Sequence, residues 1–442
     1  MEYSFKKKGD FLYYKHNKSG IIFFSNKEKF SEWKGSKDKN VFFLVKDNFW
    51  VENFPTTASS SFLESFFPPE NSTVVKLLLE SGYKLLGKSC LDEFACGGLG
   101  IFSNKGEIFN PHDKSRLVGG SSSGSAFSVS KDIVKFSIGH DAGDSVRRPS
   151  SYCGIIGFKP SYGSISRYGI IPMASSFDTV GIMSKDINMI SSIFKILHKI
   201  DYKDLTTLAF NKIKSKYLLK KNKLKKIAVI KGIEEFINKE YYQMYLDFLN
   251  KISDNNLLTV EKIDLPIEIK KSLQISYLIL CSSEISSHLN SLNGLTYGCN
   301  NDNDKTIIEK RSARIGKWTK ERIIIGNYFL KKNDLLEKAN SFRLYLVQWL
   351  KKLFKEYDFL IFPGTEGAAP KLSDLTEEKN LRKSEWIDNL LLLANLGGNP
   401  SINLPLGKIE NDLPVSINID SSWNNEEELI KFSEYLITKI KD

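Results

Sequence analysis

Residues 119–150 read GGSSSGSAFSVSKDIVKFSIGHDAGDSVRRPS, with two turns of small residues on either side of an apolar run. The first turn surrounds Ser121 with glycines, which permit backbone geometries that other residues avoid. The second turn, 139–145, ends at Ser145, and its small residues allow backbone N–H groups to converge on an oxyanion beside that serine. The apolar run at 134–138 predicts a buried strand between the two turns.

A lysine follows another apolar run, closer to the N-terminus. Residues 41–45, VFFLV, predict a buried strand, and Lys46 comes directly after it. Apolar surroundings favour the neutral form of an amine, and a neutral amine can accept a proton. Lys46 is therefore a candidate base and joins the two serine-bearing turns as the third member of a candidate catalytic set.

Strand and helix patterns alternate along the rest of the chain. Residues 1–40 are polar, Lys-rich and aromatic, and they predict short strands or loops. The other expected elements are helices at 72–81, 386–396 and from 425, strands at 84–87, 226–231, 358–362, 400–405 and 413–419, and successive helices between 231 and about 355. Strands interleaved with helices indicate the α/β class.

The composition excludes several classes of protein. The 442 residues carry 63 Lys and Arg against 52 Asp and Glu, a formal net charge of +11, and 41% are hydrophobic. These values exclude disordered, collagen-like and disulfide-rich small proteins, while the charge permits an anionic partner without requiring one. Five cysteines without a CxxC pair and five scattered histidines argue against a zinc site and for a reducing compartment. The apolar stretches are too short to span a bilayer, and the N-terminal residues lack the apolar core of a secretory peptide.

Three local patterns are better explained by structure than by function. Residues 82–89, GYKLLGKS, fit a phosphate-loop expression, but a predicted helix precedes them and their centre favours a strand. His140 stands five residues before Ser145, yet nothing around it indicates a Ser-His-Asp triad. The basic run at 212–226 is best explained as a solvated helix and linker, with a nucleic-acid patch as the alternative.

The segments that contain Lys46, Ser121 and Ser145 together resemble the amidase signature family. From 119 to 150, the spacing of glycines, serines, Asp141, Arg147 and Pro149 follows the family signature. The resemblance implies an α/β fold, an amidase-signature α/β/α sandwich with a mixed central sheet.

Two further segments are similar to the A subunits of glutamyl-tRNA(Gln)/aspartyl-tRNA(Asn) amidotransferase. They are GKSCLDEFA at 87–95 and GFKPSYGSISRYG at 157–169. The similarity is strong over 41–186 and looser over 270–420.

The resemblance implies a Ser-cisSer-Lys triad in this chain. The lysine matching Lys46 is the base, the serine matching Ser121 has a cis peptide bond and relays protons, and the serine matching Ser145 is the nucleophile. Backbone N–H groups that hold the oxyanion are expected at Ala142, Gly143, Asp144 and Ser145.

The resemblance also implies three glutamine-binding residues. Tyr297, Arg343 and Asp388 match the tyrosine, arginine and aspartate that hold the substrate in the glutaminase subunits. Arg343 suits the α-carboxylate, because a guanidinium can form two parallel hydrogen bonds with it, and Asp388 suits the α-ammonium. For each of the three, a surface residue or a structural ion pair is the alternative.

The chain departs from the family pattern at several positions. Ser123 and Asp144 stand where the family usually has Gly, His140 where it has Ser or Thr, and Ala142 where it has Thr. Asp144 matters most, because a carboxylate directly before the nucleophile opposes developing negative charge unless it is turned away.

A single domain over 1–442 is expected, because the candidate residues of one pocket are spread over most of the chain. Its parts are a divergent N-terminal segment (1–40), the signature core (41–186), a Lys-rich helical insertion or linker (187–230) and a substrate-pocket and C-terminal part (231–442).

The resemblance implies glutamine hydrolysis that supplies ammonia for amidation of misacylated Glu-tRNA(Gln) or Asp-tRNA(Asn). The implied partners are a B-type subunit, which would use ATP and Mg, and a small C-type or equivalent subunit. No cofactor, metal or membrane is expected for this chain, and its compartment is the cytoplasm or, alternatively, the mitochondrial matrix. Two alternatives remain open: a stand-alone amidase on small amides, and a catalytically weakened structural subunit of the tRNA complex.

Overall fold

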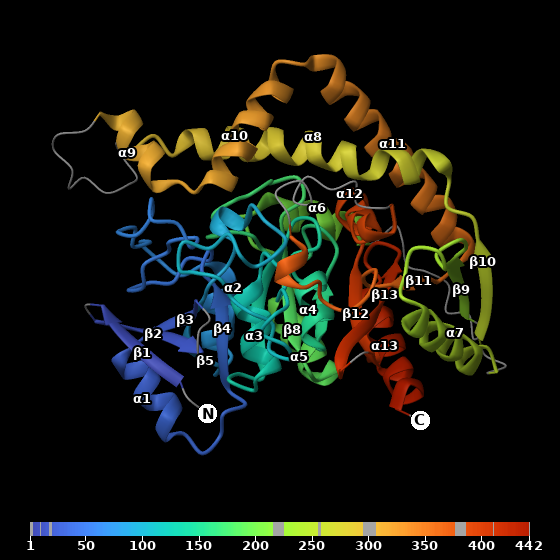
Figure 1. Cartoon of the computed structure of the whole chain (residues 1–442), viewed down its shortest axis with the longest axis horizontal. Helices are drawn as coiled ribbons and strands as arrows, with labels where there is room; N and C mark the ends of the chain where they lie inside the picture. The colour runs from blue at the N-terminus through green and yellow to red at the C-terminus, as the bar shows by residue number, and fades with distance from the viewer. Residues whose placement is uncertain are drawn as a thin grey trace.

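The computed structural model describes residues 3–8, 10–16, 20–214, 225–254, 258–294, 306–375, 386–409 and 411–441. Within them one 13-stranded sheet has the strand order β1-β2-β3-β5-β4-β6-β8-β7-β12-β13-β11-β9-β10 (Figure 1). Its strands are β1 (Tyr3–Lys8), β2 (Phe11–His16), β3 (Ile21–Asn26), β4 (Phe42–Lys46), β5 (Lys84–Ser89), β6 (Phe136–Asp141), β7 (Ile156–Lys159), β8 (Thr179–Ser184), β9 (Lys225–Ile230), β10 (Leu258–Ile263), β11 (Phe359–Pro363), β12 (Ser401–Ile409) and β13 (Leu413–Ser421).

The α-helices are α1 (Lys27–Gly35), α2 (Thr73–Glu80), α3 (Ser123–Ser130), α4 (Arg147–Cys153), α5 (Ile187–Leu197), α6 (Leu205–Lys214), α7 (Lys239–Ser253), α8 (Ile267–Ser291), α9 (Ile307–Arg314), α10 (Lys317–Leu330), α11 (Asn333–Glu356), α12 (Leu392–Gly397) and α13 (Glu426–Lys441). Short 3-10 helices are η1 (Glu93–Ala95), η2 (Leu372–Asp374) and η4 (Trp386–Asn389). No helix in the described part of the chain is both long and apolar enough to cross a membrane.

The sheet is mixed and covered on both faces. Strand β4 runs parallel to β5 and β6, whereas β6, β8, β7, β12 and β13 pair antiparallel in turn. Side chains of successive residues point to opposite faces of a strand. In β4, Phe43 and Val45 enter one apolar cluster, and Phe42 and Leu44 enter the other. The predicted α/β class with a mixed sheet between helical layers is confirmed.

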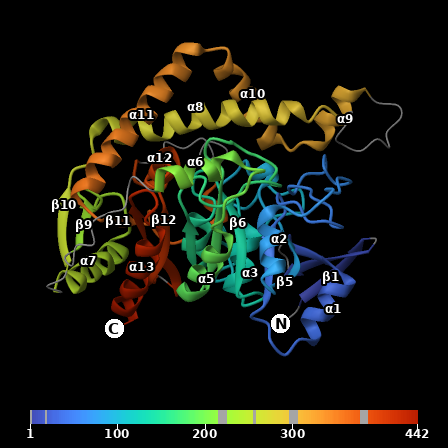
Figure 2. The ribbon, with the colours of Figure 1, turned by 180° about the vertical axis from the view of Figure 1, so that it is seen from behind.

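Four helices lie together beyond one end of the strands. Helix α8 packs against α10 and α11, and α9 lies at the end of this group away from α11 (Figure 1). Both views show the group crossing above the strand ends, on the side opposite to the two chain termini (Figures 1 and 2).

Most predicted elements are present, and the differences have physical reasons. Residues 1–40 form three strands as expected but also helix α1, and β10 interrupts the predicted run of helices. Residues 139–141 were expected in a turn but complete β6, because they pair with β8. Helix α3 begins at Ser123, earlier than its poor helix formers suggest, since seven of its eight residues are buried.

Candidate active site

Lys46 is the last residue of β4 and is wholly buried. Its Nζ donates a hydrogen bond to Ser121 Oγ at 2.7 Å and another to the carbonyl oxygen of His140 at 3.1 Å. Burial lowers the pKa of Lys46 to about 7, although the carboxylates of Asp92, Asp141 and Asp178 oppose that shift. A large fraction of this amine is therefore neutral near pH 7.

The turn around Ser121 has the unusual backbone that its glycines allow. The peptide bond between Gly120 and Ser121 is cis, and Gly119 has a φ of +77°. A Cβ at Gly119 would lie 2.9 Å from the Tyr152 ring, so a larger residue does not fit there. The cis bond agrees with the expectation that the resemblance gave for this serine.

The second turn is held against the first. Ser145 follows β6 and is 5% exposed, and its carbonyl oxygen accepts the N–H of Ser122 at 3.2 Å. The three predicted catalytic side chains therefore stand on β4, on the turn before α3 and on the turn before α4. The structure brings Lys46 and Ser121 into direct contact, while a proton path from Ser145 to Ser121 stays a prediction.

A buried ion pair fixes the Ser145 turn from inside the fold. Asp141 Oδ2 accepts the N–H of Val146 at 3.0 Å and lies 3.2 Å from Arg147 Nε. Arg147 also donates to the carbonyl oxygen of Gly143 at 2.8 Å. Burial alone would raise the pKa of Asp141, but Arg147, Lys159 and the N–H of Val146 together outweigh it, and the pKa falls to about 2.

The N–H groups of this turn are not used inside the part of the protein that the structure describes. Within the described part of the chain, the N–H groups of Gly143, Asp144 and Ser145 donate to no protein acceptor. Such groups beside a nucleophile can stabilise an oxyanion. The predicted oxyanion role of 142–145 stays a prediction that this arrangement permits.

The carboxylate of Asp144 forms an ion pair with Arg148. The Asp144 carboxylate lies 2.5 Å from Nε of Arg148, one helical turn further along the chain. Arg148 also donates to the carbonyl oxygen of Asp388 at 2.7 Å, and its Nη1 lies 3.8 Å from the Asp388 carboxylate. The unusual acid before the nucleophile is therefore neutralised, and Asp388 is brought to the same cluster.

Arg343 reaches the Ser145 turn only indirectly. It donates to the carbonyl oxygens of Leu396 and Ser176, each at 3.0 Å, and its guanidinium lies over the Phe177 ring. Phe177 in turn contacts Tyr277, whose hydroxyl lies against Gly143. Burial lowers the pKa of Arg343. Its glutamine-binding role stays a prediction.

Tyr297, the third predicted substrate residue, lies outside the described residues. Its role stays a prediction, as do those of Arg343 and Asp388.

The buried carboxylate of Asp92 near Lys46 was not expected from the sequence. Asp92 accepts the N–H groups of Gly100 and Phe102, and burial raises its pKa to about 6. Because β4 and β5 run parallel, Lys46 at the end of β4 and Asp92 just after the end of β5 lie at the same edge of the sheet. That strand pairing was the signal that could have found Asp92.

His140 is a buried residue of β6 rather than a loop histidine. Its Nε2 lies 2.9 Å from Asp178 Oδ1. Burial raises the pKa of Asp178, but His140, the N–H of Ala174 and Arg167 together outweigh it, so the pKa lies below its ordinary value. His140 is thus paired with Asp178 and not with Ser145, which agrees with the absence of a Ser-His-Asp pattern in the sequence.

The residues that fit the phosphate-loop expression do not form a phosphate-binding loop, because 84–89 form strand β5. Lys88 lies inside β5, and its Nζ is 2.9 Å from Asp47 in a fully buried pair. A lysine held in this way cannot reach a phosphate in a loop.

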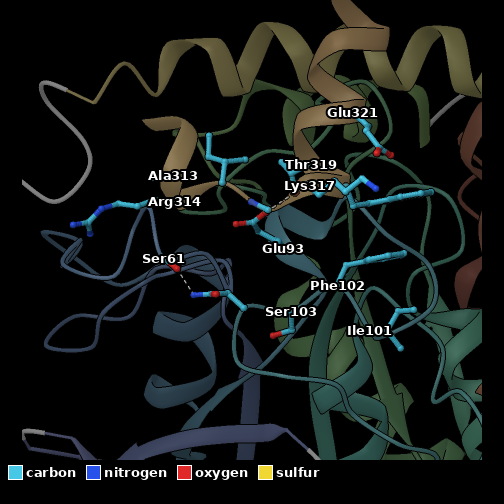
Figure 3. Close-up of a pocket in the computed structure, with 14 residues that line it drawn as sticks. Ser61, Glu93, Ile101, Phe102, Ser103, Ala313, Arg314, Lys317, Thr319 and Glu321 are labelled. Atoms are coloured by element: carbon cyan, nitrogen blue, oxygen red, sulfur yellow. Dashed lines mark hydrogen bonds between the residues drawn. The ribbon is translucent and has the colours of Figure 1, made fainter. Parts of the chain in front are cut away.

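A separate cavity of about 560 Å³ lies between α10 and the loops that follow β4 and β5 (Figure 3). None of the three predicted catalytic residues lines it. Glu93 points into it, and its carboxylate accepts hydrogen bonds from Ser60, Gly316 and Thr319. Among the described residues, no group of three or more His, Cys, Asp or Glu side chains could hold a metal ion.

Comparison with known proteins places this geometry in a family. The Amidase family model matches residues 34–430. The A subunit of glutamyl-tRNA(Gln) amidotransferase from Mycoplasma pneumoniae is 34% identical, over 90% of this chain and 85% of that protein. The mitochondrial A subunit of the same enzyme from Candida albicans strain SC5314 is 35% identical, over 83% of this chain and 86% of that protein.

Solved structures show the same fold. The crystal structure of the glutamyl-tRNA(Gln) amidotransferase A subunit from Thermotoga maritima matches with a TM-score of 0.70 and 28% identity, over 88% of this chain and 81% of that one. A peptide amidase from Stenotrophomonas maltophilia matches in fold, with a TM-score of 0.75 at 21% identity, over 94% of this chain and 86% of that one. The chain belongs to the amidase family, and within that family it is similar to the A subunits of glutamyl-tRNA(Gln) amidotransferase.

Proposed function

We propose that this chain is the glutaminase subunit of a tRNA-dependent amidotransferase. The observation that carries the proposal is the 2.7 Å contact between buried Lys46 and Ser121, beside the turn that presents Ser145. The identity of 34–35% to named A subunits over most of the chain supports the choice of substrate.

The reaction begins with proton transfer through the triad. Neutral Lys46 accepts the proton of Ser121, and Ser121 accepts the proton of Ser145 as Ser145 Oγ attacks the side-chain amide of glutamine. The backbone N–H groups of 142–145 stabilise the oxyanion.

Collapse of the tetrahedral intermediate breaks the carbon–nitrogen bond. Ser121 returns a proton to the leaving nitrogen, and ammonia departs from a γ-glutamyl ester on Ser145. Water then attacks the ester, the same relay takes its proton, and glutamate leaves as Ser145 is regenerated.

Glutamine is held at its amino-acid end in this proposal. Arg343 pairs with the α-carboxylate, Asp388 with the α-ammonium, and Tyr297 contacts the substrate. A stand-alone amidase on small amides would use the same triad without these residues.

The ammonia passes to partner subunits. A B-type subunit uses ATP and Mg to amidate misacylated Glu-tRNA(Gln) or Asp-tRNA(Asn), and a small C-type or equivalent subunit completes the complex. This chain needs no cofactor of its own for glutamine hydrolysis. We place the complex in the cytoplasm, with the mitochondrial matrix as the alternative.

A glutaminase assay of the purified chain, alone and with a B subunit, tests the proposal. Ammonia release that depends on the B subunit is the expected result. Turnover of small amides by the chain alone, at a rate that does not change when the B subunit is added, would favour the stand-alone amidase. A chain that supports tRNA amidation only with external ammonia would favour the structural subunit.

A further inference from the structure

Arg148 joins the residue before the candidate nucleophile to a candidate substrate residue. It lies in α4, and its guanidinium is 2.5 Å from Asp144 Oδ2 through Nε. Through Nη2 it donates to the carbonyl oxygen of Asp388 at 2.7 Å. The 3-10 helix η4, which carries Asp388, is therefore fixed to the turn that carries Ser145.

The neighbouring arginine supports the same segment from the other side. Arg147 donates to the carbonyl oxygen of Leu391 at 2.8 Å and to Ser401 Oγ at 3.1 Å, while it pairs with Asp141 inside the fold. The two successive arginines have different tasks. Arg147 holds the turn to the core, and Arg148 lies between the two acids at the edge of the site.

The charges of this cluster leave one negative charge in excess. The side chains of Asp144, Arg148 and Asp388 are 16%, 15% and 17% exposed, so solvent screens them only in part. Burial lowers the pKa of Arg148, but Asp144, Tyr152 and Asp388 together outweigh it and hold the pKa well above its usual range. One cation among two carboxylates gives a net charge of about −1, the charge that suits an ammonium group.

We propose that Arg148 is a positioning residue for glutamine: it neutralises Asp144 beside the oxyanion donors and holds Asp388 toward the α-ammonium group. The proposal rests on the proposed glutaminase function. It explains how an acid is tolerated before the nucleophile, because Asp144 and Arg148 cancel each other and Asp388 keeps its charge for the substrate. Replacement of either Asp144 or Arg148 alone then changes the charge of the cluster.

The test is a double-mutant cycle in the chain bound to its B subunit, with ammonia release as the readout. The variants are Asp144→Asn, Arg148→Gln, the double variant and the conservative Arg148→Lys. The substrates are glutamine and 4-carbamoylbutanoate, which is glutamine without its α-amino group. Ser145→Ala is the blank, and thermal melts show that each variant folds.

The two single variants are expected to fail in different ways. Asp144→Asn leaves Arg148 to cancel Asp388, so KM for glutamine rises roughly tenfold while kcat/KM for 4-carbamoylbutanoate changes less than about twofold. Arg148→Gln leaves a free carboxylate beside the oxyanion, so kcat falls roughly tenfold for both substrates, and it also releases Asp388, so KM rises for glutamine but not for 4-carbamoylbutanoate. Arg148→Lys retains most of the activity with both substrates.

The double variant decides the question. It removes the acid beside the oxyanion, so kcat for both substrates returns to within about threefold of the wild type, whereas KM for glutamine stays raised because Asp388 still lacks its contact with Arg148. A double variant whose kcat is no better than that of Arg148→Gln overturns the proposal, and so does an equal loss of activity on both substrates in Asp144→Asn. A wild-type complex without any glutaminase activity overturns the proposed function itself, and this inference with it.

Discussion

Lys46 Nζ lies 2.7 Å from Ser121 Oγ, and both side chains are completely buried. A lysine in this position serves as a base only when it has lost its proton, and burial is what makes that loss easy. The burial of Lys46 in the core of the sheet therefore sets the protonation state of the candidate base.

Glutaminase activity should depend on the protonation of Lys46. Because the pKa of Lys46 is lowered to about 7 and the neutral form is the active one, kcat/KM should rise with pH and level off above about pH 8. Lys46→Ala should lower kcat roughly 10²- to 10⁴-fold. The measurement is ammonia release between pH 5.5 and 9, and a rate that falls as pH rises through 7 contradicts the assignment.

Removal of the charge of Asp92 should shift that pH profile. The carboxylate of Asp92 raises the pKa of Lys46, so Asp92→Asn should move the midpoint toward lower pH by roughly half a unit to one unit. Glu93→Gln is the matched control, because Glu93 belongs to the separate cavity and should leave the midpoint in place. An equal shift in both variants would count against a specific Asp92–Lys46 interaction.

Asp141 should contribute stability through Arg147. Asp141→Asn leaves a buried guanidinium without its partner and should lower the free energy of unfolding by roughly 3–5 kcal/mol. The control Asp113→Asn removes a partly exposed pair with Arg116 and should cost less than about 1 kcal/mol. Urea unfolding of both variants at pH 7 measures the difference, and equal losses would show that Asp141 is no more important than a surface acid.

The same pair should respond to acid. The folded pKa of Asp141 is about 2, below the value of roughly 3.9 for an unfolded aspartate. Its stabilisation is therefore complete above about pH 4 and is lost as pH falls toward 2. The gap in stability between wild type and Asp141→Asn should narrow over that interval, and a gap that stays constant would refute the role of ionisation.

Gly143 should tolerate no side chain. A Cβ there would stand 2.5 Å from the hydroxyl of Tyr277, so Gly143→Ala should displace the oxyanion donors and lower kcat roughly 10- to 100-fold. Tyr277→Phe in the same chain removes the closest atom and should restore part of the activity. Steady-state kinetics of the three variants tests this, and full activity in Gly143→Ala would exclude a role for this turn geometry.

The sequence predicted the parts of the fold that depend on local pattern. The run before Lys46 is apolar throughout and forms a strand buried on both faces. Strand β10 was missed because it is an edge strand, paired only with β9, and its residues are only partly buried. The helical start at Ser123 depends on tertiary burial, which overrides the weak helix propensity of serine and glycine.

The candidate site was predictable in its chemistry more than in its contacts. Lys46, Ser121 and Ser145 lie in segments with recognisable composition, and the structure places the first two in contact, while their catalytic roles stay a prediction. The pairing of Asp144 with Arg148 depends on helix α4 beginning directly after the nucleophile. The nearness of Asp388 joins positions 240 residues apart, and no local pattern could show it. The single-domain division of the chain stays a prediction.

The central claim is that Ser145 carries the acyl group of glutamine. The complex is mixed with glutamine, quenched in acid within its first turnovers, digested and examined by mass spectrometry. The account predicts a γ-glutamyl ester on the peptide that contains Ser145, and none in Ser145→Ala, which releases no ammonia. An ester on another residue, or near-normal ammonia release by Ser145→Ala, would contradict it.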